Sequence, residues 1–247
     1  MLFPIGDDQV KGGHYPLFSY GFIGLNVLAF LLQMLYPDHL VCDYGAIPRE
    51  IMQGEDLITL LTSMFLHGDA LHLLGNMLFL WVFADNIEAT IGNGRFLLFY
   101  IIGGLAAVGT HIFFSLGGDV AYCCAPCGGG VPCLTNSLVC GVDTPMIGAS
   151  GAISAVMGAY LVMFPSSRVK MWFFFLTFRI PAFLFLGFWI WQQWSSGMES
   201  LEVINGTSGS VAWWAHIGGF IFGILAGLYY RIAFKPGRVY REYDGFR

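Results

Sequence analysis

Long apolar stretches separated by short polar segments run through most of this chain. A helix needs roughly 20 apolar residues to cross the hydrocarbon core of a bilayer. Six stretches are candidates, at about 16–36, 70–84, 96–116, 145–164, 171–194 and 211–232. The apolar segment 57–66 is too short to span, so we expect it to lie on the membrane or part-way into it. The pattern predicts an all-α, polytopic membrane protein built as a six-transmembrane-helix bundle.

Lys and Arg are concentrated on one side of these spans. With six spans both termini lie on the same side, which holds Lys11, Arg95, Arg168, Lys170, Arg231, Lys235, Arg238, Arg241 and Arg247. The opposite loops carry one basic residue, Arg49, among many acidic ones. Because cytoplasmic loops are enriched in Lys and Arg, we predict cytoplasmic termini and outward-facing acidic loops, in a bacterial cytoplasmic (inner) membrane.

The predicted organisation is a cytoplasmic segment 1–15, a six-span domain 16–232 and a basic cytoplasmic tail 233–247. The first segment lacks the basic start and cleavage site of a signal peptide, so we expect no cleavage there. Arg179 is the one cation inside a predicted span. It either snorkels to the cytoplasmic surface or pairs with an anion inside the membrane.

Composition agrees with this class, because 56% of the 247 residues are hydrophobic and only 11% are charged. Soluble domains carry about a quarter charged residues. The net charge of -5 comes without any basic patch interleaved with aromatics, so no nucleic-acid partner is expected. The lipid bilayer is the partner that composition predicts.

All six cysteines fall on the predicted outer side. They are Cys42 in the first outer loop and Cys123, Cys124, Cys127, Cys133 and Cys140 in a Gly-rich extracytoplasmic loop at about 117–144. An even count in an oxidising compartment favours disulfides, with the pairing left open. Metal binding is the alternative, because Cys124 and Cys127 have a zinc-knuckle spacing, although no histidine lies nearby.

A serine and a histidine lie near the outer ends of two inward-running spans. Ser150 in Gly-Ala-Ser-Gly and His216 in Ala-His-Ile-Gly-Gly each fall five residues into a predicted span. At 1.5 Å per residue, both lie roughly 7–8 Å below the start of their helix. A serine hydroxyl becomes a good nucleophile when a histidine accepts its proton. No acidic residue in the last span could orient His216, so we infer a Ser–His dyad.

His72 and Asn76 lie one helical turn apart in the first turns of the second span. The Asn76 amide, the His72 ring N–H and the Ser150 backbone N–H are donors that could stabilise an oxyanion. These residues therefore predict a catalytic site at one depth on three helices.

Two stripes of small residues would allow the helices to approach. Gly219, Gly223 and Gly227 recur every four residues in the last span, as do Gly151, Ala155 and Ala159 in the fourth. Such spacing lets helix backbones come close in lipid. If the stripes face each other, they bring His216 towards Ser150, although such stripes often serve packing alone.

Each signal has a structural alternative. A lone Gly-x-Ser-Gly is weak, because serines in transmembrane helices commonly bond back to their own helix. A lone intramembrane histidine is commonly a structural hydrogen bonder. A transporter or channel would need ionisable residues along a path or broken helices in two related halves, whereas these polar residues cluster at one depth.

The combined motifs resemble the rhomboid family of intramembrane serine proteases over about residues 16 to 232. The matches are Gly148 to Gly151, His216 with Gly219 and Gly223, and His67 with His72 and Asn76. The resemblance implies Ser150 as nucleophile, His216 as base, His72 and Asn76 as oxyanion donors, and His67 as a structural hydrogen bonder. It also implies an endopeptidase that cleaves transmembrane segments of single-span proteins, without cofactor or metal, in a cavity open to outside water.

The chain departs from the family pattern in three places. Ile58 and Thr59 stand roughly where a Trp-Arg pair is common, and Ser154 stands where an aromatic often stacks on the histidine. We therefore expect packing from another helix to hold His216. The Cys-rich loop is an addition to the core. A rhomboid-like protein that binds transmembrane helices without cleaving them is the main alternative.

Overall fold

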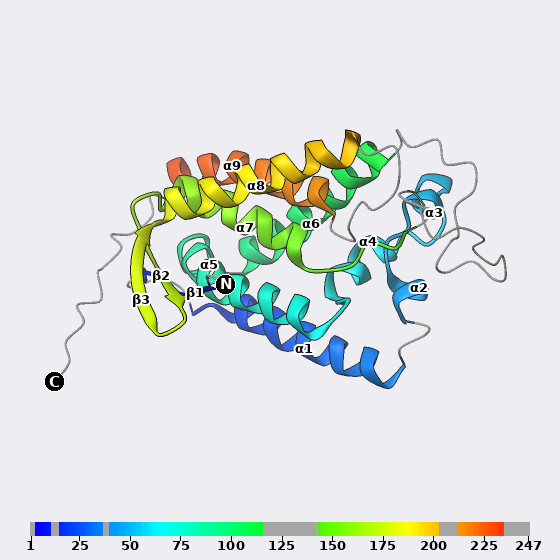
Figure 1. Cartoon of the computed structure of the whole chain (residues 1–247), viewed down its shortest axis with the longest axis horizontal. Helices are drawn as coiled ribbons and strands as arrows, with labels where there is room; N and C mark the ends of the chain where they lie inside the picture. The colour runs from blue at the N-terminus through cyan, green and yellow to red at the C-terminus, as the bar shows by residue number, and fades with distance from the viewer. Residues whose placement is uncertain are drawn as a thin grey trace.

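The computed structural model describes residues 3–10, 15–36, 40–115, 142, 144–202 and 212–234 (Figure 1). Its long helices are α1 (Leu17–Leu35), α5 (Ala70–Ile91), α6 (Asn93–Ser115), α7 (Ser150–Met163), α8 (Ala182–Glu202) and α9 (Trp213–Phe234). They lie side by side along the long axis of the molecule. The predicted helical bundle is confirmed.

Short elements close the two ends of the bundle. Helices α2 (Leu40–Tyr44), α3 (Pro48–Gln53) and α4 (Thr59–Thr62) and the 3-10 turn η1 (Ser63–Phe65) gather at one end. Strands β1 (Phe3–Gly6), β2 (Arg168–Phe173) and β3 (Leu176–Pro181) form an antiparallel sheet of order β1-β2-β3 at the other end. Since α4 and η1 are short, the apolar segment 57–66 does not span, as expected.

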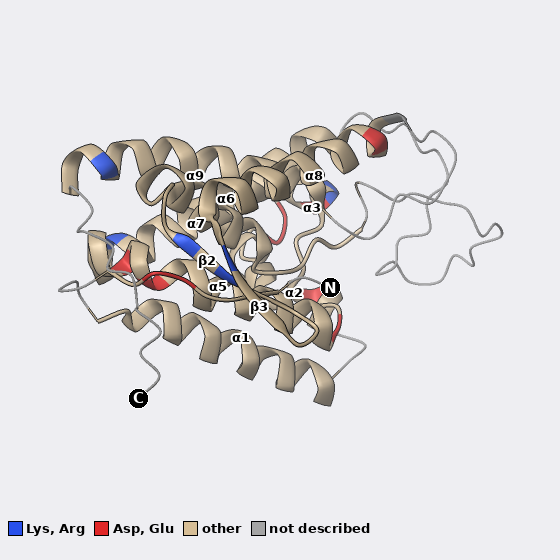
Figure 2. Ribbon diagram, turned by 60° about the vertical axis from the view of Figure 1, so that its left-hand side comes forward, with Lys and Arg blue, Asp and Glu red and all other residues tan. Residues whose placement is uncertain are grey.

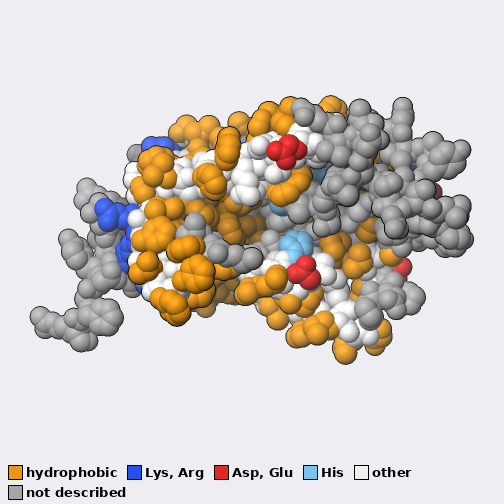
Figure 3. All heavy atoms as spheres, in the orientation of Figure 1, with side chains coloured by type: hydrophobic (Ala, Val, Ile, Leu, Met, Phe, Trp, Pro, Cys, Tyr) orange, Lys and Arg blue, Asp and Glu red, His pale blue; other side chains and the backbone are white. Residues whose placement is uncertain are grey.

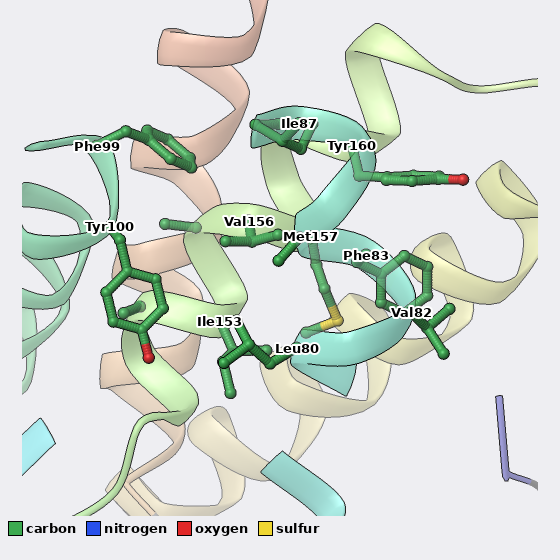
Figure 4. Close-up of a cluster of buried hydrophobic side chains, with 14 of the residues drawn as sticks. Leu80, Val82, Phe83, Ile87, Phe99, Tyr100, Ile153, Val156, Met157 and Tyr160 are labelled. Atoms are coloured by element: carbon green, nitrogen blue, oxygen red, sulfur yellow. The ribbon is translucent and has the colours of Figure 1, made fainter. Parts of the chain in front are cut away.

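Helix α7 is the centre of the bundle and is buried from Gly151 to Tyr160. Its side chains Ile153 and Met157 pack among Leu80 and Phe83 of α5 and Tyr100 of α6 (Figure 4). Helices α1, α5, α6 and α9 are long and apolar enough to cross a membrane, while α7 is shorter. A 14-residue helix spans about 21 Å, less than the roughly 30 Å of hydrocarbon core. Residues at an end of α7 can therefore lie below the membrane surface.

The predicted start of the fifth span is wrong. Residues 171–181 belong to the β2–β3 hairpin, and α8 begins only at Ala182 and runs on to Glu202. An apolar run does not by itself distinguish a strand from a helix. Here β2 pairs with β3 across a two-residue turn and with β1 from the start of the chain, and this distant partner, which only the fold supplies, favours strand.

The placement of Arg179 inside a span is wrong for the same reason. Arg179 lies on β3, and its Nη1 is 3.4 Å from Oδ1 of Asp8. It therefore has an anionic partner, but at the end of the bundle and outside the long helices. The N-terminal segment supplies that partner, because β1 pairs with β2.

The charge asymmetry read from the sequence is visible in the folded molecule. Figures 2 and 3 show Lys and Arg gathered towards the end that carries the sheet. The cations there are Arg95, Arg168, Lys170, Arg179 and Arg231. We refer to this end as the basic end.

Candidate active site

Ser150 is the first residue of α7, which corrects the prediction that it lies five residues inside a helix. The preceding segment is extended rather than helical. Met146 forms an isolated β-bridge with Ala46, and the Gly148 N–H donates to the Ser63 carbonyl at 2.9 Å. The first N–H groups of a helix have no intrahelical acceptor, and the helix dipole is positive there. The Ser150 backbone N–H is one of these first N–H groups of α7.

His216 lies in the first turn of α9 with its ring against Ser150. The Ser150 Oγ and His216 Nε2 are 2.8 Å apart, a hydrogen-bond distance. The predicted small-residue stripes bring them together: a Cβ at Gly219 would overlap the Gly151 carbonyl, and one at Gly223 would overlap the Ala155 carbonyl. The two stripes therefore face each other, which is the condition for bringing His216 towards Ser150.

Gln193 on α8 contacts the other side of the His216 ring. Its Oε1 lies 2.7 Å from His216 Nδ1, and the side chain is only 4% exposed. An amide oxygen accepts, so Nδ1 carries the proton and Nε2 is left to accept from the Ser150 hydroxyl. Sequence reasoning missed Gln193, because the equally polar Gln192 stands beside it and no motif marks either residue.

Two tryptophans hold the imidazole where the usual aromatic is missing. The rings of Trp189 on α8 and Trp213 on α9 have centroids 5.8 and 6.2 Å from that of His216. Ser154, which stands in the aromatic's place, instead donates to the Ser150 carbonyl at 2.6 Å. The expectation that packing from another helix holds His216 is confirmed.

Gly148 separates Ser150 from His72. Its φ is +122°, and a Cβ there would lie 2.9 Å from His72 Cε1 and 3.6 Å from Ser150 Oγ. The absent side chain leaves a gap between the nucleophile and the His72 ring. The Gly68 N–H lies 3.5 Å from His72 Nδ1, which is therefore the acceptor. The His72 proton is then on Nε2, the nitrogen nearer Gly148.

Asn76 joins the site through His67. Its Nδ2 lies 2.9 Å from His67 Nε2, and an amide NH2 keeps a second N–H for another acceptor. The Gln33 side chain in turn bonds both the N–H and the carbonyl of His67, at 2.9 and 3.1 Å. Burial, and secondarily the charge of His72, lower the pKa of His67 to about 4. His67 is therefore neutral near pH 7, and its expected structural role is confirmed.

Within the described ranges, no group of three His, Cys, Asp or Glu side chains could hold a metal ion. Cys42 is disulfide-bonded, which confirms the disulfide prediction for that residue. Cys123, Cys124, Cys127, Cys133 and Cys140, with most of the Cys-rich loop, lie outside the described residues. Their disulfide or metal chemistry stays a prediction.

Comparison with known proteins shows which family the chain belongs to. A rhomboid domain matches residues 54–233. The chain belongs to the rhomboid family. It is thus a multi-pass membrane protein of a family that includes a serine protease.

The relatives of this rhomboid differ in length and compartment. It is 26% identical to mitochondrial rhomboid protein 1 of Saccharomyces cerevisiae over 89% of this chain and 55% of that protein. It is 27% identical to mitochondrial RHOMBOID-like protein 12 of Arabidopsis thaliana over 83% and 56%. Rhomboid protease GluP of Bacillus subtilis is 30% identical over 62% of this chain and 26% of its own length.

This rhomboid therefore spans about half the length of the first two relatives. Those two are mitochondrial by name. The comparisons thus do not support the predicted bacterial cytoplasmic membrane, and they leave the membrane itself unassigned.

Proposed function

We propose that this rhomboid is an intramembrane serine endopeptidase that cleaves transmembrane segments of single-span membrane proteins. The observation that carries the proposal is the chain of contacts from Gln193 through His216 to Ser150, at 2.7 and 2.8 Å. An imidazole held on one nitrogen by an acceptor and on the other by a serine hydroxyl is arranged as a general base.

The proposed reaction begins when Ser150 Oγ attacks the scissile carbonyl and His216 Nε2 takes its proton. The oxyanion accepts hydrogen bonds from the Ser150 N–H, from His72 Nε2–H and from the Asn76 amide. His216 then gives the proton to the leaving amine, which breaks the peptide bond and leaves an acyl-enzyme. In the second half, His216 takes a proton from a water, whose oxygen attacks the acyl carbon. The bond to Ser150 Oγ then breaks as His216 returns the proton to Oγ, which releases the second product.

We propose α8 as the side through which a substrate helix enters. Its Phe183, Phe188 and Trp191 are exposed, so one face of α8 is available to lipid and to a substrate helix. Because Gln193 is on the same helix, displacement of α8 would also remove the group that orients His216. The dyad would then be complete only when α8 has returned.

In topology, we propose that both termini lie on the basic side and that the site opens to the opposite side. Neither cofactor nor metal takes part in the proposed reaction.

The test is cleavage of a single-span reporter by the full chain in liposomes. The wild type should cleave it and the Ser150→Ala variant should not, while a fluorophosphonate should label Ser150 but not a His216→Ala variant. Equal cleavage by wild type and Ser150→Ala would contradict the proposal. Reporter binding without cleavage or labelling would favour the alternative, a rhomboid-like protein that binds transmembrane helices.

A further inference from the structure

The β2–β3 hairpin leaves the basic end of the bundle and finishes in an exposed aromatic turn. In Figure 1 it runs crosswise to α8 and α9, across the end of the helices. Val169 and Met171 at its base are buried. At its tip Phe174 is 65% exposed and Phe175 is 97% exposed.

The hairpin is amphipathic along its length. Residues directly opposite each other in an antiparallel pair share a face. Lys170 pairs with Arg179 and Trp172 with Thr177 on one face. Met171 pairs with Phe178 and Phe173 with Leu176 on the other.

The apolar face extends beyond the protein that covers its base. Met171 is buried, whereas Phe173, Leu176 and Phe178 towards the tip are exposed. The same exposure continues into α8, where Phe183 and Leu184 face outward directly after the hairpin. Exposed apolar side chains therefore occur both on the outer part of the hairpin and in the first turn of α8.

The two turn residues, Phe174 and Phe175, are not the types that a water-exposed hairpin turn favours. Two-residue hairpin turns require positive φ and favour Asn-Gly. Phe174 has such a positive φ, 52°, although this conformation is an outlier for a bulky side chain. An aromatic pair in such a turn gains free energy only if its surroundings are apolar.

We propose that the β2–β3 hairpin lies in the lipid interface at the basic end of the bundle. Phe173, Phe174, Phe175, Leu176 and Phe178 insert at the boundary between head groups and acyl chains. Arg168 and Lys170, on the opposite face, lie at the level of the head groups and attract anionic ones. Buried apolar area and attraction to anionic lipid together bind such amphipathic elements. The hairpin thus anchors the base of α8, whether or not the chain is a protease.

The test places a small fluorescent amino acid at position 175 of the full chain in vesicles of phosphatidylcholine and phosphatidylglycerol. The matched control carries the same probe at position 177, on the basic face. Lipids brominated on their acyl chains should quench the probe at 175 at least about threefold more than the probe at 177, and acrylamide should show the reverse order. Strong acrylamide quenching at both positions without bromolipid quenching would overturn the proposal.

A second measurement separates lipid from a second copy of the chain. Energy transfer between labelled copies that rises with the protein-to-lipid ratio, together with weak bromolipid quenching, would assign the face to self-association and overturn the proposal.

A turn variant separates insertion from hairpin folding. Phe174→Asn combined with Phe175→Gly supplies the residues that a water-exposed turn prefers, so the unfolding temperature in detergent should not fall. With the probe at position 176, bromolipid quenching should fall at least about twofold in this variant. Unchanged quenching would show that the aromatic turn is not the anchor.

Discussion

Gln193 decides which ring nitrogen of His216 carries the proton. A neutral imidazole has one donor and one acceptor nitrogen, and the tautomer is set by the hydrogen bond that the other nitrogen makes. The Gln193 acceptor at 2.7 Å from Nδ1 fixes the useful tautomer without a charge. In the proposed reaction, this amide takes the orienting role that a carboxylate has in a Ser-His-Asp triad, because α9 carries no acidic residue.

Gln193→Leu keeps most of the side-chain volume and removes the acceptor. We expect kcat to fall about 10- to 100-fold with KM little changed, because an orienting partner of a catalytic group is lost. Gln193→Glu keeps an acceptor and should retain more activity than Gln193→Leu. Reporter cleavage kinetics in liposomes measure both.

The matched control is Gln192→Leu, since Gln192 is the exposed neighbour on α8. It should leave kcat unchanged. Equal loss of kcat in the two leucine variants would mean that polarity of α8, and not the contact with His216, is responsible.

Gly148→Ala should inactivate the site. A φ of +122° strains any other residue, and the new Cβ would lie 2.9 Å from His72 Cε1. The new methyl would fill the gap between Ser150 and the His72 ring, where the proposed oxyanion forms. We therefore expect kcat to fall at least about 100-fold. Gly109→Ala on α6, where a Cβ meets nothing within 4 Å, is the control and should retain activity.

At the scale of elements, the site depends on how closely α7 and α9 pack. Gly219, Gly223 and Gly227 each leave room only for backbone or small side chains of α7. Their effect is to bring the start of α9 to the start of α7, which are the positions of His216 and Ser150.

Gly223→Ala tests this packing away from the chemistry. The added methyl would overlap the Ala155 carbonyl, so we expect about 1–3 kcal/mol of destabilisation. The unfolding temperature in detergent should fall by several degrees. Gly21→Ala on α1 faces open space and should be neutral or slightly stabilising. Equal effects of the two substitutions would contradict the close approach.

The N-terminal segment is held at the basic end by a pH-sensitive carboxyl. Asp7 accepts hydrogen bonds from Tyr160 and Asn86. Burial, and after it the charge of Asp85, raise the pKa of Asp7 well above its ordinary value of 3.8. A raised pKa means that the folded state favours the protonated form. The contribution of Asp7 to stability is therefore largest at low pH and is lost as pH rises through the folded pKa.

We expect the N-terminal segment to become more accessible to protease as pH rises above about 4. The reason is that ionisation of the buried Asp7 carboxyl destabilises the folded position of this segment. Asp7→Asn cannot ionise and should flatten this pH dependence while keeping hydrogen-bond capacity. Limited proteolysis at fixed protease activity, followed by mass spectrometry, measures the effect. The same pH profile in wild type and Asp7→Asn would exclude Asp7 as its cause.

On the scale of the whole molecule, the basic end and the Ser150–His216 pair lie at opposite ends of the helices. Strand β1 pairs with β2, so the N-terminal segment lies at the same end as the connection between α7 and α8. Ser150 and His216 lie at the starts of α7 and α9, whereas Arg231 lies near the end of α9.

Sealed vesicles of one orientation should show this sidedness. A protease site fused to the N-terminus should be cut from one side only. Cations stay on the cytoplasmic side of most membrane proteins, and Ser150 lies at the end of the bundle away from them. A membrane-impermeant fluorophosphonate should therefore reach Ser150 from the side opposite to the N-terminus. Cutting and labelling from the same face would refute the predicted topology.

The sequence alone determined the class of the molecule, its number of long helices, its charge asymmetry and four candidate site residues. These follow from local properties, namely run length, hydropathy, the sign of side chains and short spacings. The tertiary structure alone decided that residues 171–181 are strands, that α7 starts at Ser150 and that Gln193 meets His216. Each of these depends on a partner far away in the chain: β1 for the hairpin, the Ser63 carbonyl for Gly148, and α9 for Gln193. Local pattern carries no information about such partners, so only the folded chain could supply them.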